Sequence, residues 1–159
     1  MKNTIKSSVF ILLAILAASC SSDSTDDNPM DAAASVQAVS NLATSGSWRI
    51  TSFIDSGIDD TNDFQGYSFT FNADGSLVAE NGTAIITGSW SVTTDDSSDD
   101  SDDYNSSDDI DFNIFFSAPP DFAELTDDWD IVSRSASRIE LIDISGGNGG
   151  TDTLTFEKN

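Results

Sequence analysis

Hydrophobic and polar residues alternate in about eight short runs between residue 46 and residue 158. Alternation with a period of two is typical of β-strands that bury one face. The predicted strands cover residues 48–54, 67–71, 77–79, 84–92, 110–116, 129–134, 138–144 and 151–157. Short links such as 72–75 and Asn81-Gly82 are turn signals that join neighbouring strands into antiparallel hairpins. A meander of about eight such strands can close into an up-and-down barrel, so the predicted fold is all-β.

Strand parity predicts which side chains point into this barrel. On the first strand, Trp48, Ile50 and Ile54 share the inward face, and Phe53 falls on the outward face. The tripeptide Gly-Ser-Trp occurs twice, at 46–48 and 88–90, and parity brings both copies to the same end of the barrel. We therefore predict that Trp48 and Trp90 are structural plugs of a closed end.

The opposite end, here called the far rim, receives the connections that follow the first, third, fifth and seventh predicted strands. An apolar ring beneath long loops is where a barrel admits a ligand. The predicted ligand-binding residues at the far rim are Ile54, Phe64, Tyr67, Ile86, Phe116, Phe122, Trp129 and Leu154. The alternative is that the same side chains fill a dry interior.

Residues 1–19 have the plan of an export signal, with Lys2 and Lys6 ahead of an apolar run over 9–18. This run has about half of the ~20 residues that a membrane span needs. The stretch from Leu16 to Cys20 resembles a bacterial lipobox, which implies cleavage before Cys20 and lipidation of its thiol. Lipidated Cys20 would hold the protein on a membrane. The alternative is a soluble secreted protein with a chance cysteine.

Residues 20–45 are predicted to form an acidic tether followed by a short helix over 29–43, with Val36, Val39 and Leu42 at helical spacing. Ser and Asp residues directly behind Cys20 resemble the start of surface-exported lipoproteins of the Bacteroidota. The resemblance implies an outer-membrane location on the cell surface, with the periplasmic face as the alternative.

Charge and composition exclude several functions. The chain has 28 acidic and 6 basic residues and no histidine, so nucleic-acid binding is not expected. Without histidine there is neither a Ser-His-Asp triad nor an ordinary zinc site, and we expect no enzyme activity, cofactor or bound metal. The Asp-rich segment 95–109 lacks the glycine and distal glutamate of a calcium loop and is predicted to be a solvated charge run. Asp143 is the one acid singled out as inward-facing by parity.

Several motifs of residues 46–158 resemble a lipocalin-like domain. Gly46-Ser47-Trp48 is similar to the motif that opens the first lipocalin strand, and 69–75 resembles the second-strand hairpin of bacterial relatives. Trp129, 139–141 and 154–157 resemble the closing strands. The resemblance implies a non-catalytic barrel that binds a small apolar or glycan-like molecule at its open rim. The alternative is a surface interaction module, such as a complex subunit or an inhibitor, with a filled core.

Overall fold

The computed structural model describes residues 29–94, 110–144 and 150–159. Several predictions lie outside these residues, namely those for the signal peptide, Cys20, the acidic spacer and the Asp-rich segment 95–109. Most of the last far-rim connection, 145–149, also lies outside them. The helical elements are α1 (Pro29–Ala43), the 3-10 helix η1 (Thr61–Phe64) and α2 (Pro120–Ala123). The strands are β1 (Ser47–Asp55), β2 (Ile58–Asp59), β3 (Ser68–Phe71), β4 (Ser76–Glu80), β5 (Ile85–Thr94), β6 (Ile110–Phe115), β7 (Asp127–Ser135), β8 (Arg138–Ile144) and β9 (Thr151–Lys158).

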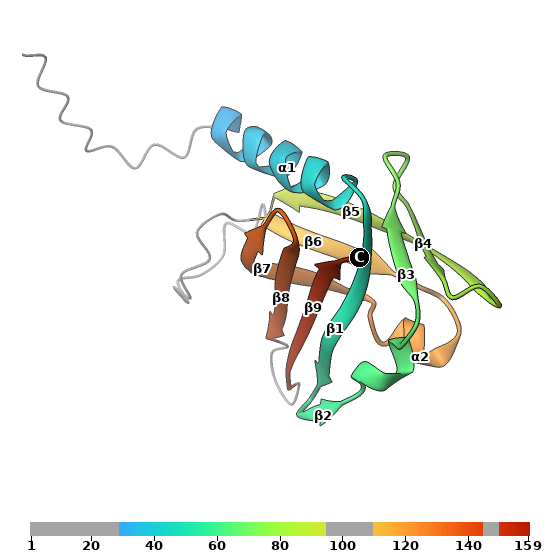
Figure 1. The fold of residues 1–159 in the computed structure, drawn as a ribbon. Coiled ribbons are helices and arrows are strands. Elements are labelled where there is room, and N and C mark those ends of the chain that lie inside the picture. The colour runs from blue at the N-terminus through green and yellow to red at the C-terminus, as the bar shows by residue number, and fades with distance from the viewer. Residues whose placement is uncertain (1–28, 95–109, 145–149) are drawn as a thin grey trace, which may run out of the picture.

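The described strands form one antiparallel sheet that closes into a barrel (Figure 1). Each strand from β3 to β8 pairs with the next one along the chain, and β1 pairs with both β3 and β9. The short strand β2 attaches to β1 outside this ring. The prediction of an antiparallel up-and-down barrel of about eight strands is therefore confirmed. The sequence pattern did not predict β2 or η1.

The hairpin from β3 to β4 shows why these residues fold as they do. Phe69 and Phe71 alternate with polar residues and are buried. The turn uses Gly75 with a φ of 84°, a conformation that favours glycine. The backbone N–H of Ser76 donates to Oδ1 of Asp74 at 3.0 Å, which fixes the chain as it enters β4.

A bulge in β1 changes the parity of its second half. The register against β9 shifts between Ile50 and Ser52, so that Phe53 pairs with Leu154 and is buried. The prediction that Ile54 faces inward and Phe53 outward is therefore wrong. One extra residue in a strand reverses the face of every side chain beyond it. Ile54 is half-buried and lies outside the hydrophobic core.

The two ends of the barrel differ in what covers them. Helix α1 lies across the end where β1 begins, here called the near end, and β2 and α2 lie at the far rim (Figure 1). Val39 and Ala43 of α1 are buried against the barrel, so the predicted helix is confirmed. Among the helices of the described residues, none combines the length and apolar character that a membrane crossing requires.

Candidate functional site

The far rim is filled by aromatic side chains from its own connections. Phe64 of η1 and Phe122 of α2 are buried, and their ring centroids lie 5.3 Å apart. The Phe122 ring also lies 5.3 Å from that of Phe116, which follows β6, and 5.0 Å from that of Tyr67. Such edge-to-face contacts are a favourable aromatic arrangement. We call Phe64, Tyr67, Phe116 and Phe122 the aromatic plug.

The structure places the other predicted ligand-binding residues around or below this plug. Trp129 and Leu154 are fully buried, and the indole N–H of Trp129 donates to the carbonyl oxygen of Leu125 at 3.1 Å. Ile86 is partly buried and packs against the core. The structure thus brings seven of the eight predicted residues to the core, and the exception is Ile54 for the reason given above.

Trp48 and Trp90, the two residues expected from parity to plug one end, both lie at the near end. The indole N–H of Trp48 donates to the carbonyl oxygen of Ala43, the last residue of α1, at 2.8 Å. The indole N–H of Trp90 donates to the carbonyl oxygen of Asn72 at 2.9 Å, and its ring stacks on Phe112. Both indoles are therefore held by packing and by a backbone hydrogen bond.

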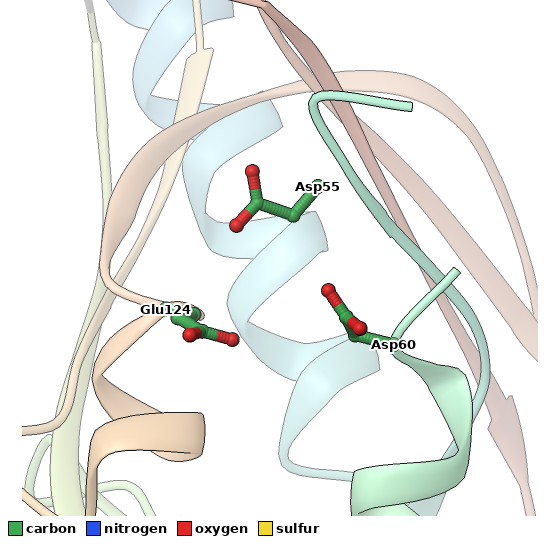
Figure 2. Close-up of side chains that lie close together, drawn as sticks. All are labelled: Asp55, Asp60 and Glu124. Carbon is green, nitrogen blue, oxygen red and sulfur yellow. The ribbon is translucent and has the colours of Figure 1, made fainter. Parts of the chain in front are cut away.

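Acidic side chains from several connections converge at the far rim. Figure 2 shows the carboxylates of Asp55, Asp60 and Glu124 facing one another, and their oxygens lie within 4.8 Å of each other. Asp55 ends β1, Asp60 precedes η1, and Glu124 follows α2, so the β1–β3 connection supplies two acids of this triad and the β6–β7 connection supplies the third. Burial raises the pKa of Glu124, and the charges of Asp55 and Asp60 add to the effect. Burial also raises the pKa of Asp60, with Asp63 as the next cause.

A second triad consists of Asp127, Asp143 and Asp152, with carboxylate oxygens again within 4.8 Å of one another. Asp143 pairs with Asp152 across β8 and β9, two residues from the buried pair of Leu141 and Leu154, so both acids have inward parity. The inward parity predicted for Asp143 is thus confirmed. Asp152 also accepts a hydrogen bond from the backbone N–H of Ser56 at 2.6 Å. The second triad therefore lies at the mouth of the barrel.

Charge is separated between the two ends of the described barrel. The basic residues of the described ranges lie on strand segments at the near end, namely Arg49, Arg134, Arg138 and Lys158. Arg138 forms ion pairs with Glu140 and Glu157 there, at 2.6 and 2.7 Å. In the part of the chain that the structure describes, the far rim thus carries two carboxylate triads and no Lys or Arg side chain. Each triad offers three oxygen ligands of the type that Ca²⁺ takes, out of the roughly six to eight that this ion needs.

Neutralising Asp127 should change how stability depends on pH. Burial raises the pKa of Asp127 to about 6, and the carboxylates of Asp128 and Asp143 act in the same direction. The folded state thus binds the proton of Asp127 more tightly than the unfolded state does. The stabilisation that this bound proton gives the folded state is complete below about pH 4 and is lost as the pH rises through 6. We expect Asp127→Asn to raise the free energy of unfolding at pH 7 by about 1 kcal/mol, allowing for solvent screening, with the gain disappearing by pH 4.

The control for this experiment is Asp74→Asn. Hydrogen bonds from Ser76 lower the pKa of Asp74, so its stabilisation is present at neutral pH and is lost as the pH falls. Urea denaturation across this pH range should therefore show opposite signs for the two variants at pH 7. An Asp127→Asn variant that is less stable than the wild type at pH 7 would contradict the raised pKa of Asp127 in the folded state.

Sequence reasoning missed most of these acids, because the triads combine residues from separate connections.

Comparison of the chain with protein-family models finds no match, and comparison with curated proteins finds none either. Among solved structures, a DUF4847 family protein from Bacteroides vulgatus is similar, with 18% sequence identity and a TM-score of 0.47. The similarity covers 76% of this chain and 97% of the other.

Proposed function

We propose that this chain is a non-catalytic, lipid-anchored outer-membrane protein whose filled, lipocalin-like barrel acts as a surface interaction module. The observation that carries the proposal is the aromatic plug. Phe64 and Phe122 occupy the end of the barrel through which an internal ligand would enter. A barrel with this packing offers its outer surface and its rims to a partner, as a complex subunit or an inhibitor does.

The position of the tether supports the far rim as the presented surface. The chain reaches the barrel through α1 at the near end, so a lipid on Cys20 would leave the far rim pointing away from the membrane. The far rim also exposes Ile58 and Ile144 beside its acidic triads. A partner that covers this rim must supply cationic groups, because burying unpaired carboxylates is costly.

Uptake of an apolar fluorescent dye tests whether the barrel is filled. We expect wild-type protein to leave N-phenyl-1-naphthylamine in solution, and Phe122→Ala to take it up, because removing the ring opens an apolar void beneath the far rim. Engineered apolar cavities in proteins stay dry and bind small apolar molecules. The measurement is the rise in dye fluorescence on titration with protein, with circular dichroism to verify that each variant is folded.

Val132→Ala is the matched control for dye uptake. Val132 is exposed on β7, so its truncation opens no internal void. Phe122→Leu provides a milder change at the plug itself if the alanine variant fails to fold. Saturable dye binding by wild-type protein, or an organic molecule retained in its native mass spectrum, would favour a carrier of small apolar ligands over an interaction module.

A further inference from the structure

The outer wall of the barrel has a groove over β5 and β6 whose lining contains one acidic residue, Asp127. Strand β5 has no Asp, Glu, Lys or Arg in its ten residues, in a chain that contains 28 acidic residues. The groove has a volume of about 360 Å³ and lies open to solvent. This is within the range of roughly 300–1,000 Å³ that is typical of small-molecule sites.

Register explains which side chains form the groove. Trp90 of β5 and Ile114 of β6 pair with each other and are buried, so their neighbours along each strand point outward. The outward row of β5 contributes Ser89, Ser91 and Thr93, with Ser89 opposite Phe115 and Ser91 opposite Asn113.

The residues that line the groove combine hydroxyls, one amide, one exposed ring and, at its edge with β7, the acidic residue Asp127. The side-chain amide of Asn113, which lines the groove, donates to Oγ1 of Thr93 at 2.9 Å. Phe115 is 54% exposed, although the even-numbered residues beside it are fully buried. Among the exposed large apolar side chains of the described residues, Phe115 is the one aromatic ring, and it lies next to hydroxyl and amide groups.

We propose that this groove binds a neutral carbohydrate chain. Each sugar hydroxyl both donates and accepts, as do the Ser, Thr and Asn side chains of the groove. The apolar face of a sugar ring can cover the exposed ring of Phe115. The net charge of −22 and the carboxylate of Asp127 in the groove disfavour an anionic ligand, whereas a carboxylate accepts hydrogen bonds from sugar hydroxyls. This binding site goes beyond the proposed role of the far rim and does not depend on it.

Affinity electrophoresis in native gels tests the groove. The probes are soluble glucan, mannan, galactan and xylan, with polygalacturonate as the anionic comparison. We expect at least one neutral polysaccharide to retard the wild-type protein, and polygalacturonate to leave its mobility unchanged. Phe115→Ala should weaken the retardation about tenfold, because the sugar loses its stacking surface. Ser91→Tyr should weaken it to a similar extent, because the larger side chain fills the groove.

Val132→Ala is the matched control, since Val132 is 60% exposed on β7 and does not line the groove. Retardation that persists in Val132→Ala and is lost in the two groove variants supports the proposal. If none of the four neutral polysaccharides retards the wild-type protein, or if Phe115→Ala and Ser91→Tyr bind as well as the wild type does, the proposal is overturned. Dye uptake by the barrel interior is independent of each of these results.

Discussion

Replacing Trp48 with alanine should lower the free energy of unfolding by about 3–5 kcal/mol, the usual cost of removing a large buried aromatic side chain. Trp48 has no solvent exposure and lies at the start of β1, where β1 pairs with both β3 and β9. Its indole also joins the barrel to α1 through the hydrogen bond to Ala43. Loss of the ring should therefore loosen both barrel closure and the packing of the helix. Urea denaturation measures the change.

Trp48→Phe separates packing from hydrogen bonding at this position. The smaller ring retains most of the apolar contacts but leaves the buried carbonyl oxygen of Ala43 without its donor, which costs about 1–3 kcal/mol. Val132→Ala, on the exposed face of β7, should change stability by less than about 0.5 kcal/mol. A Trp48→Ala variant as stable as the wild type would mean that the near end is held by other contacts.

The alternation of apolar residues was enough to predict the barrel, because each of its principal strands buries one face. Strand β6 shows this most directly, since Ile110, Phe112 and Ile114 are buried and Phe115 is exposed as parity requires. The bulge in β1 could not be predicted by assuming unbroken alternation. The sequence signal for the bulge is the three-residue step from Ile50 to Phe53. Two large apolar residues at this odd spacing can share one face of a strand only if one extra residue intervenes.

The candidate site was predicted only in part. Parity correctly brought Phe64 and Phe122 to the same end of the barrel, but sequence alone did not decide whether they line an entrance or fill it. The answer depends on how η1 and α2 fold inward, and only their contact distances show this. The carboxylate triads were harder to predict, since Asp60 and Glu124 meet only after two distant connections have packed at one rim.

Replacing Cys20 with serine should release the protein from membranes. The prediction depends on the stretch from Leu16 to Cys20, where a thiol is needed to form the thioether that carries lipid. Each buried methylene of an acyl chain contributes about 0.8 kcal/mol, so several chains on one residue give stable anchoring, whereas a serine side chain contributes none. Cell fractionation followed by immunoblotting should move nearly all of the protein from the membrane pellet to the soluble fraction.

Ser22→Ala is the control for Cys20→Ser, because it changes a neighbouring polar residue without touching the thiol. Its membrane retention should match the wild type. An uncleaved leader does not offer a second anchor of comparable strength, since the apolar run over 9–18 is about half of the ~20 residues that cross a bilayer. Cys20→Ser protein that stays in the membrane pellet after a carbonate wash would therefore rule out lipidation as the anchor. The orientation argued for the far rim would then lose its basis, because that orientation requires a membrane attachment at the near end.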